Sequence, residues 1–512
     1  MPRASTESGA DVPGGRLDTQ VIVVGAGPVG LLLAGELRLG GAHVVVLERR
    51  TAPTTESRAS TLHARTMEIL DSRGLWDGLP DPPNDLRGHF AGIPLDLSLP
   101  GSRPGQWKVP QFDTERLLGR WAAGLGADIR RGHEVRAVTD TGGYVEAEAV
   151  GDGGPVLVRA DYLVACDGED STVRHLVGAD FPGHDARREL LRADVEGIEV
   201  SDRRFERLPD GLAIAARRAD GVTRVMVHEH GAPAVDRDGA PAFGEIAQAW
   251  KRVTGEDISG GTPVWVNAFG DAARQLARYR HGRVLFAGDA AHRQMPIGGQ
   301  ALNLGLQDAF NLGWKLAAEV TGRAHTELLD SYHQERHTIG RRVLSAIEAQ
   351  ALLLLGGPEV EPLRSLVTEL IGHEDVRAHL AATISGLDIR YDVGGPAHPL
   401  VGARLPRTPL AASTSASTSG GATSTDTLRS GRGLLLGPGG DPNFDPNLDP
   451  VLGPLLSGRG IPFATPAPSA PGTEGAGWTL VRPDGHVVWA NPSGRPPEEG
   501  LTEALNRWFG PA

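Results

Sequence analysis

The glycine-rich stretch GAGPVG at residues 25–30 constrains the fold more than any other part of the sequence. An apolar run at 21–24 precedes it, a helical pattern at 31–39 follows it, and a second apolar run begins at 44. This order predicts a βαβ unit, which requires a parallel sheet. A GxGxxG turn in this context lets the backbone approach a pyrophosphate at the helix N-terminus, where unpaired N–H groups and the helix dipole favour an anion. A plain glycine-rich turn is the alternative.

An acidic residue, Glu48, stands at the end of the second predicted strand, 18 residues after Gly30. Its carboxylate can accept hydrogen bonds from ribose hydroxyls, and it would repel a 2′-phosphate, which disfavours NADP at this site. Arg49 follows it and is either a further contact or solvated surface. The predicted contacts of this dinucleotide site are Gly25, Gly27, Pro28, Val29, Gly30, Glu48 and Arg49.

A second motif, GDAAHRQMPIGGQALNLGLQDA, occupies residues 288–309. An apolar run ends at Asp289, whose carboxylate can accept hydrogen bonds from a polyol chain. We expect Gly298, Gly299 and Gln300 to begin a helix, whose unpaired N–H groups would stabilise negative charge on a reduced flavin ring. FAD contains the pyrophosphate, the ribityl chain and the ring that the two motifs would bind, so their co-occurrence favours FAD over NAD.

A third stretch, CDGEDSTVR at 166–174, is by itself an ordinary turn and helix start that Ser171 or Asp170 could cap. Cys166 is the single cysteine, so the chain forms no internal disulfide and no cysteine-based metal site. Its apolar surroundings favour a buried small side chain over a reactive thiol. We predict no metal site.

The order of strand-like and helical patterns along the sequence predicts an α/β protein of several domains. Strand-like runs with one helix at 185–270 indicate an antiparallel sheet inserted into the first domain, and the stretch GWTLVRPDGHVVWA predicts a hairpin near the C-terminus. Residues 411–427 are low-complexity Ser, Thr and Gly, which is typical of a flexible loop. The predicted parts are a disordered arm at 1–18, an FAD-binding domain at 19–184 and 271–395, a substrate-binding middle domain at 185–270, and a C-terminal domain at 396–512.

Composition excludes several classes of partner. The net charge of −13 argues against nucleic acid as a partner. No run approaches the roughly 20 apolar residues of a membrane span, and the N-terminus lacks the apolar stretch of a signal peptide. Together with the single cysteine, this predicts a cytoplasmic protein without a membrane partner.

The three motifs together resemble the class A, single-component FAD-dependent aromatic hydroxylases of the p-hydroxybenzoate hydroxylase type. The resemblance covers residues 20–390, and ESRASTLHARTMEILDSRGL, VWVNAFGDAARQLARYRHGRV and LLDSYHQERH resemble bacterial tailoring hydroxylases of aromatic polyketides of the angucycline kind. It implies a Rossmann-like FAD domain with the p-hydroxybenzoate hydroxylase fold, an inserted antiparallel-sheet substrate domain and a thioredoxin-like C-terminal domain. The tail contains no cysteine, so that last domain is not redox-active.

The resemblance also implies roles for individual residues. Arg58 matches an arginine near FAD and the nicotinamide path, while Arg65 is a phosphate-side contact or a solvated helix residue. Asp167 matches an aspartate tied to FAD and NAD(P)H handling. The remaining FAD contacts would be Gln111 and Asp289 at the ribityl chain, Pro296 beside the ring, and Gly298, Gly299, Gln300, Ala301 and Leu302 along its pyrimidine side.

One residue departs from the family pattern GGQGxN, because this chain has Ala301 where a glycine is usual. Alanine would be strained if that backbone needed a positive φ, and harmless if the position is helical. We expect the helical case.

The chemistry implied is hydroxylation of a polycyclic aromatic polyketide in antibiotic biosynthesis. NADPH or NADH reduces FAD, O₂ forms a flavin C4a-hydroperoxide, and an electron-rich phenol takes up the oxygen. No side chain is expected to be catalytic, since the cofactor supplies the chemistry. His63 and His292 are either proton carriers or loop architecture, and Trp265 and Phe269 either line the substrate site or belong to the core.

Two alternatives stay open at this point: Baeyer–Villiger or epoxidase-type oxygen insertion, and a flavoprotein without turnover. A flavin-dependent halogenase is disfavoured because no two tryptophans lie two residues apart, as its W-x-W-x-I-P motif requires. The chain is expected to be a monomer or a homodimer.

Overall fold

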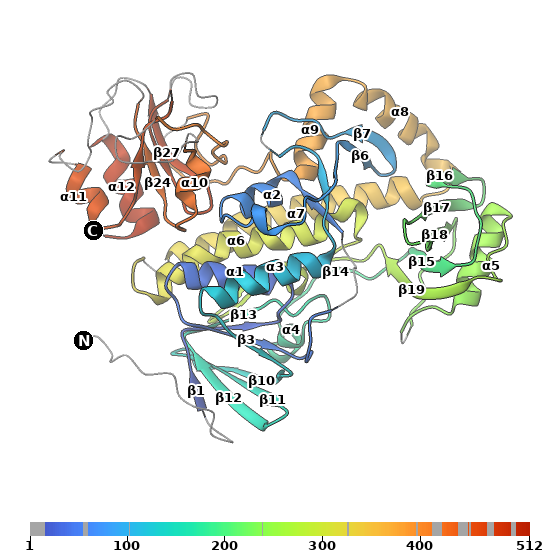
Figure 1. Ribbon diagram of the computed structural model, residues 1–512, viewed down its shortest axis with the longest axis horizontal. Helices are drawn as coiled ribbons and strands as arrows, with labels where there is room; N and C mark the ends of the chain where they lie inside the picture. The colour runs from blue at the N-terminus through green and yellow to red at the C-terminus, as the bar shows by residue number, and fades with distance from the viewer. Residues whose placement is uncertain are drawn as a thin grey trace.

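A computed structural model describes residues 16–54, 60–101, 103–237, 239–324, 327–395, 398–411, 422–438, 449, 452–467, 476–492 and 498–511. Figure 1 shows three regions: a central body of sheet and long helices, a further sheet at one end, and a C-terminal sheet with its helices at the other.

The central body contains a six-stranded sheet in the order β21-β22-β13-β2-β3-β9. Every neighbouring pair is parallel except β21 with β22, so the predicted βαβ unit is present. Its strands are β2 (Val21–Val24), β3 (Val44–Glu48), β9 (Asp128–Arg131), β13 (Tyr162–Ala165), β21 (Arg280–His281) and β22 (Val284–Phe286). The runs 21–24 and 162–165 are fully buried, as expected for a parallel strand covered on both faces.

Helices α1 (Pro28–Leu39), α3 (Gln111–Gly124) and α6 (Gln300–Val320) pack side by side over this sheet. Small residues permit the close approach, because a Cβ at Gly35 would overlap Trp121 and a Cβ at Gly313 would overlap Glu36. The shorter elements around them are α2 (Ala64–Asp71), α4 (Thr172–Leu176), η1 (Trp76–Gly78), η2 (Gly288–Ala290), η3 (Ile297–Gly299), β4 (Thr61–His63), β5 (Asn84–Asp85), β6 (Arg87–Phe90), β7 (Ile93–Asp96), β8 (Gln106–Lys108), β14 (Gly183–His184), β20 (Ala273–Gln275) and β23 (His292–Arg293).

The N-terminal arm ends earlier than predicted. Residues 16–18 form β1 (Arg16–Asp18), which pairs in parallel with β12 at the edge of a four-stranded sheet. An edge strand is held by backbone hydrogen bonds to its partner strand, so it needs no apolar pattern that could be recognised in the sequence. Residues 1–15 lie outside the described residues. The other strands are β10 (Glu134–Asp140), β11 (Val145–Gly151) and β12 (Gly154–Ala160).

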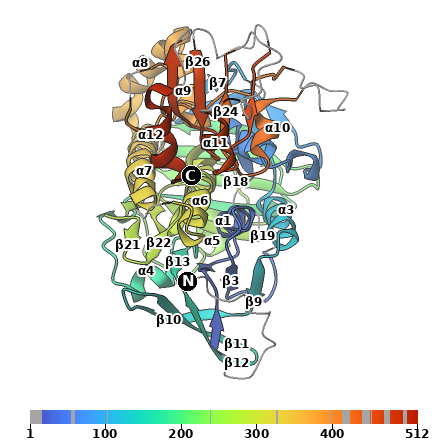
Figure 2. The same cartoon turned by 90° about the vertical axis from the view of Figure 1, so that its left-hand side faces the viewer.

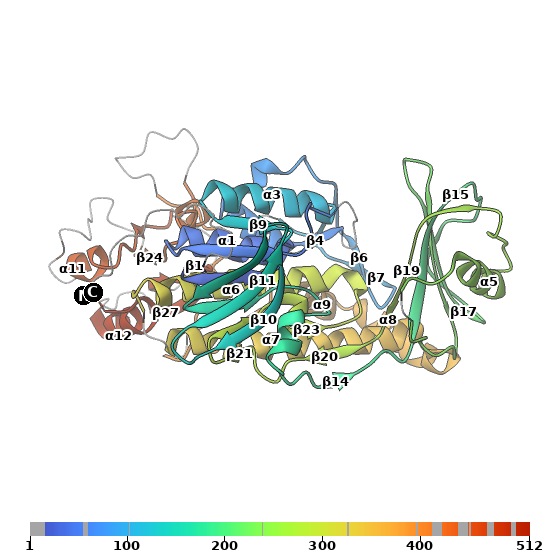
Figure 3. The same cartoon turned by 90° about the horizontal axis from the view of Figure 1, so that it is seen from below.

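The predicted antiparallel sheet has the strand order β16-β17-β18-β15-β19. One face packs on α5 (Phe243–Thr254), and Figure 3 shows this helix on the outer side of the sheet, away from the central body. The strands are β15 (Glu189–Glu196), β16 (Arg203–Leu208), β17 (Gly211–Arg217), β18 (Thr223–Glu229) and β19 (Thr262–Gly270). The opposite face contributes Leu190, Leu212, Ile214, Met226 and Phe269 to an apolar cluster shared with the central body.

The segment after residue 299 is helical, as predicted. It contains α6, α7 (Glu327–Leu355), η4 (Pro358–Val360), α8 (Glu361–Ile371) and α9 (Glu374–Ser385). Among the described residues no single helix is both long and apolar enough to cross a membrane; α7 with Pro358–Ile371 passes that test of length and composition only as a pair bent by 118°.

The C-terminal sheet has the order β25-β24-β26-β27 and includes the predicted hairpin. The low-complexity prediction was wrong at its end, because Ser424–Leu428 form α10. Thr423 and Asp426 cap this helix reciprocally, which fixes its start; residues 412–421 lie outside the described residues. The remaining elements are β24 (Leu434–Leu436), β25 (Phe463–Ala464), β26 (Ala476–Val481), β27 (Val487–Pro492), α11 (Leu452–Ser457) and α12 (Glu498–Phe509).

The turn of the C-terminal hairpin packs against the central body and forms buried ion pairs with it. Figure 2, which faces the C-terminal region, shows its strands and α12 in front of α6 and α7. Arg482 donates to both oxygens of Glu335 on α7, at 2.6 and 3.0 Å, and also to Asp484. Lys315 of α6 donates to Glu335 at 2.8 Å. These four charged groups are at most 2% exposed, so two cations and two carboxylates neutralise one another without water.

We predict that Arg482→Met lowers the free energy of unfolding by about 3–5 kcal/mol, because it leaves two buried carboxylates to share one lysine. Urea unfolding measures this. Arg429→Met is the matched control: that arginine is half exposed and pairs with Asp426, so its loss should cost less than about 1 kcal/mol. Equal effects of the two substitutions would contradict the account.

Candidate active site

Four predicted site residues lie at the carboxyl ends of adjacent parallel strands. Gly25 follows β2, Glu48 ends β3, Asp167 follows β13, and Asp289 follows β22. Carboxyl ends of neighbouring parallel strands meet at one edge of a sheet, which is where open α/β sheets bind their ligands. The sheet thus brings together residues as far apart in the sequence as Gly25 and Asp289.

Close contacts at glycines show how tightly these motifs meet. A Cβ on Gly25, whose φ is +102°, would collide with the carbonyl oxygen of Cys166. A Cβ on Gly288 would lie 3.1 Å from a methyl group of Val29. Cys166 itself is buried, and burial raises its thiol pKa well above the usual value, so the prediction of an inert small side chain is confirmed.

The N-terminus of α1 has no side-chain cap. Gly27 is its N-cap residue, Pro28 is its first residue, and a Cβ added to Gly27 would meet no atom within 4 Å. By contrast, a Cβ on Gly30 would collide with the carbonyl oxygen of Gly25, so this glycine lets the helix approach the preceding strand. The arrangement leaves N–H groups and open space at the start of the helix, which suits a pyrophosphate.

Glu48 holds the neighbouring loops as well as facing this edge. One carboxylate oxygen accepts from the backbone N–H of Ala26 and the other from that of Arg50, each at 2.8 Å. Each oxygen retains a lone pair for a ribose hydroxyl. Arg49 is exposed.

One carboxylate oxygen of Asp167 is buried without a hydrogen-bond partner among the described residues. Its Oδ2 accepts from the N–H of Val173 at 3.1 Å, while its Oδ1 is buried and has no hydrogen-bond partner in the described part of the chain. Burial raises the pKa of this carboxyl, and the hydrogen bonds that it accepts only partly offset that effect. Ser171 caps α4 by accepting from Arg174, as one of the two alternatives predicted. An orphaned buried acceptor fits a cofactor with hydroxyl groups at this point.

The loop that follows β22 is fixed by a cluster of fully buried polar groups. Asp308 of α6 accepts from the N–H of Gly288 at 3.1 Å, from His292 at 2.8 Å and from Arg336 of α7 at 2.7 Å. Asp308, His292 and Arg336 are all 0% exposed. Burial alone would raise the pKa of Asp308, but Arg336 and His292 hold it below its usual value. The cluster presents Asp289, the residue after Gly288, on the exposed side of the loop.

The two histidines left open by the sequence are parts of this architecture. His292 is bound to Asp308. His63 ends β4, and its Nε2 lies 2.7 Å from the carbonyl oxygen of Gly298. Burial lowers the pKa of His63 to about 4, so the ring is neutral and donates Nε2–H to that carbonyl. Both side chains position the loop around residues 288–299.

The expected helix start was wrong by two residues. Gly298 and Gly299 have φ values of +62° and +72°, and α6 begins at Gln300 with Gly299 as its N-cap. The left-handed backbone turns the chain into the helix and needs glycine at both positions. Ala301 lies within α6, so the expectation of a helical, unstrained alanine is confirmed. Pro296 is exposed, Gln300 is buried and Leu302 is half-buried.

Asn303 is a residue that sequence reasoning missed. Its side-chain oxygen accepts from the N–H of His63 at 2.8 Å and from the hydroxyl of Thr66 at 2.7 Å. Its amide donates to the carbonyl oxygens of Thr61 and Gly299. An asparagine in the first turn of a helix, four residues after a glycine pair, was the only available signal.

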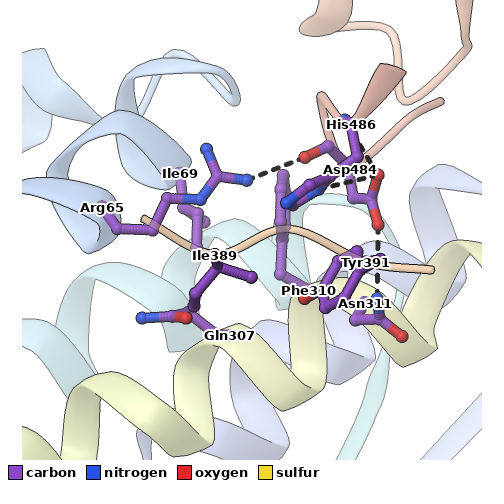
Figure 4. Close-up of a pocket in the computed structure, with 9 residues that line it drawn as sticks. All are labelled: Arg65, Ile69, Gln307, Phe310, Asn311, Ile389, Tyr391, Asp484 and His486. Carbon is purple, nitrogen blue, oxygen red and sulfur yellow. Dashed lines mark hydrogen bonds and ion pairs between the residues drawn. The ribbon is translucent and has the colours of Figure 1, made fainter. Parts of the chain in front are cut away.

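Arg65 was expected either to contact a phosphate of the cofactor or to be a solvated helix residue, and the structure places it instead against the C-terminal hairpin. It is buried, and its guanidinium donates to the carbonyl oxygen of Asp484 in the C-terminal hairpin at 2.9 Å. Figure 4 shows it beside Phe310 and His486, at the junction of α2, α6 and the hairpin turn. The distant hairpin that supplies its partner could not be inferred locally. Gln111 is the half-buried first residue of α3, and Arg58 lies outside the described residues.

Residues 18–346 match the family model of an "FAD binding domain", and residues 398–512 match that of "Aromatic-ring hydroxylase, C-terminal". The chain belongs to the FAD-binding aromatic-ring hydroxylases. As a member of this family, it is an FAD-dependent aromatic monooxygenase. The three motifs, the fold and the cofactor predicted from the sequence agree with this family.

Three relatives of this hydroxylase differ in their described activity. The solved structure of CabE, an aromatic hydroxylase from angucycline biosynthesis, is 48% identical with a TM-score of 0.89, and the match covers 97% of this chain and 100% of CabE. The 12-dehydrotetracycline 5-monooxygenase/anhydrotetracycline 6-monooxygenase of Streptomyces rimosus is 40% identical, over 96% of this chain and 99% of the relative. The dialkyldecalin synthase of Streptomyces rugosporus is 39% identical, with the same coverage.

We predict that Gly27→Ala separates cofactor binding from folding in this hydroxylase. The backbone at Gly27 is extended and nothing occupies the space of a Cβ, so the free energy of unfolding of the apoprotein should change by less than about 1 kcal/mol. The FAD dissociation constant should rise at least about tenfold, because the methyl group would occupy the space of the pyrophosphate. Fluorescence titration measures it, with Gly124→Ala as a control in open space on α3. Unchanged FAD affinity would refute the assignment.

The depressed pKa of His63 predicts a pH dependence of stability. In the unfolded chain His63 is protonated below about pH 6.5, whereas in the native state it is protonated only below about pH 4. Stability should therefore fall as the pH falls through this window, by up to about 3 kcal/mol from this group. Chemical unfolding at several pH values should show His63→Gln losing less stability than the wild type below pH 6.5. A difference between the two that does not vary with pH would contradict the burial argument.

Proposed function

We propose that this monooxygenase hydroxylates a polycyclic aromatic polyketide in antibiotic biosynthesis, with NADPH or NADH and O₂ as co-substrates. The observation that carries the proposal is the convergence of the three motifs at one sheet edge, in a chain that is 48% identical to CabE over 97% of its length. CabE is described as an aromatic hydroxylase from angucycline biosynthesis, and an electron-rich phenol of that class is the substrate proposed.

In this proposal different groups of residues bind different parts of FAD. The α1 N-terminus, with Gly25, Gly27, Pro28, Val29 and Gly30, binds the pyrophosphate, and Glu48 accepts from the adenosine ribose. Support comes from the uncapped helix and the open space at Gly27. Arg49, exposed beside Glu48, remains a proposed outer contact.

The rest of the proposed site surrounds the ribityl chain and the ring. Asp289 and Gln111 bind the ribityl chain, and Asp167 uses its orphaned Oδ1 to accept a hydroxyl of the cofactor. The ring would be held by the segment Pro296, Gly298, Gly299, Gln300, Ala301 and Leu302, and the start of α6, where no side chain caps the helix, would offer N–H groups to its pyrimidine part. Arg58, outside the described residues, is proposed from the resemblance alone.

When bound and reduced by NAD(P)H, FAD would activate O₂, one atom of which is transferred to the substrate while the other leaves as water. The chain's own residues bind, orient and exclude water. Asp308, His292 and Arg336 hold the loop that bears Asp289, and His63 fixes the carbonyl of Gly298. The apolar face of the middle sheet, where Met226 and Ile214 belong to the same cluster as Met295 and Ile297, would exclude water from the substrate side. No side chain is needed as nucleophile.

We also propose that the C-terminal region has a thioredoxin-like fold that serves as structure. Its β24-α11-β25 segment is a parallel βαβ unit, followed by the β26–β27 hairpin and α12, which is the strand order of a small thioredoxin-like sheet. Without cysteine it has no redox function. Its hairpin turn instead contributes Arg482 and Asp484 to the buried ion cluster.

A second function has one observation in its favour. The dialkyldecalin synthase is 39% identical over 96% of this chain, and its name describes no oxygen transfer. A flavoprotein that binds FAD without oxygenating its substrate is therefore the alternative. Baeyer–Villiger or epoxidase-type insertion keeps the oxygen transfer and changes only the product.

The test is consumption of NADPH and O₂ by the FAD-loaded protein, with and without a tetracyclic angucycline-type phenol, combined with mass spectrometry. The proposal predicts consumption that the phenol accelerates and a product one oxygen heavier, whose NMR spectrum shows an intact ring with a new hydroxyl. A ring-expanded product indicates Baeyer–Villiger insertion. Bound FAD without phenol-stimulated oxygen uptake would contradict the proposal and favour the non-oxygenating alternative.

A further inference from the structure

Arg192 is a buried cation whose guanidinium makes no hydrogen bond within the described residues. It lies in β15, is 6% exposed, and its Nε is buried without a partner. Its one ion pair joins Nε to Oδ1 of Asp194 at 3.9 Å, which is too long for a hydrogen bond. Burying a charge without hydrogen bonds is unfavourable unless another group completes the site.

The neighbouring carboxylate does not provide the hydrogen bonds that the Arg192 guanidinium lacks. Both oxygens of Asp194 accept from Arg224, each at 2.7 Å, and Arg218 donates to the same carboxylate at 3.3 Å. Arg218 also pairs with Asp220 at 2.7 Å, so three guanidinium groups share two carboxylates, which leaves an excess of one positive charge. Burial and the nearby Arg224 lower the pKa of Arg192 to about 10, so it still carries its charge at neutral pH.

The sheet directs Arg192 toward the central body. The neighbouring residues Leu191 and Ala193 face α5, so Arg192 projects from the opposite face. In register it stands between Asn267 of β19 and Met226 of β18, and Met226 packs in the same cluster as Met295 and Ile297 of the loop beside α6. Figure 3 shows this sheet standing between α5 and the central body.

Flat apolar groups flank the cation. The guanidinium carbon lies 4.5 Å from the centre of the Trp265 ring. On the other side of Arg192, Met226 of β18 and its cross-strand partner Ile214 of β17 form a row of apolar side chains. A cation beside a row of flat and flexible apolar side chains suits an aromatic plane that bears one acidic oxygen at its edge. A phosphate or a free carboxylate would leave the apolar row without a partner.

We propose that Arg192 binds a phenolate or enolate oxygen at the edge of the aromatic substrate, with Asn267 beside it, and so selects substrates that bear an acidic hydroxyl there. This inference rests on the proposed function and names the subsite that orients its substrate. A positive charge at that oxygen favours the ionised phenol, whose ring is richer in electrons and thus more reactive toward an electrophilic oxygen.

The test uses the oxidised FAD-loaded protein without NAD(P)H, and two planar probes: 2-hydroxy-9,10-anthraquinone and 9,10-anthraquinone. Flavin difference spectra measure binding, and the colour change of the hydroxyquinone on ionisation reports the pKa of the bound probe. The wild type should bind the hydroxylated probe about tenfold more tightly than the plain quinone. It should also ionise the bound probe at least one pH unit below the free probe.

Arg192→Gln should abolish both differences, while Arg192→Lys should keep the lowered ionisation because it keeps the charge. Arg217→Gln is the control, since it removes an exposed arginine from the same sheet and should change neither. If Arg192→Gln does not fold, the two wild-type comparisons still decide. Equal affinity for the two quinones, or an unshifted ionisation in the wild type, would overturn the inference. A positive result without phenol-stimulated oxygen uptake would remove the proposed reaction and leave the subsite standing.

Discussion

The carboxylate of Asp308 is the interaction on which the cofactor side of this structure depends. It stands 20 residues beyond the loop that it holds, on the helix that covers the sheet, and it binds the backbone of Gly288, the ring of His292 and the guanidinium of Arg336. Two helices and one loop therefore share a single buried charge. Because Asp289 follows Gly288 directly, the position of the proposed ribityl contact is set by a group that never touches the cofactor.

The C-terminal region is connected to the same framework. Glu335, which binds Arg482 of the hairpin turn, is the neighbour of Arg336 on α7. Arg336 also donates to the hydroxyl of Tyr391, and the Tyr391 ring lies 4.4 Å from that of His486 in the hairpin. The C-terminal region thus has a structural role, because its hairpin turn supplies the buried charge of Arg482 that pairs with Glu335 between α6 and α7. Arg65 belongs to this junction, since it donates to the carbonyl of Asp484.

The sequence predicted those parts of the site that depend on local pattern. The βαβ unit, the glycine turn, Glu48 at a strand end and the later Gly-Asp turn all follow from residues close to one another in the chain. The sequence did not predict β1, because an edge strand depends on a distant partner, or the start of α6 at Gln300, because φ values of two glycines are not encoded in periodicity. Arg65, Asn303 and Arg192 were missed or misassigned for a related reason: their roles depend on partners, or on the lack of partners, that only the tertiary structure defines.

The most direct test of the account is the FAD dissociation constant of Asp308→Asn, compared with wild type and with Asp330→Asn, an exposed carboxylate on α7 that pairs with Arg280. Fluorescence titration should be made at a temperature where circular dichroism shows all three proteins folded. If Asp308 sets the cofactor loop, its variant should bind FAD at least about tenfold more weakly, while the Asp330 variant binds as the wild type does. Wild-type affinity in a folded Asp308→Asn protein would contradict the claim that this buried carboxylate holds the FAD site together.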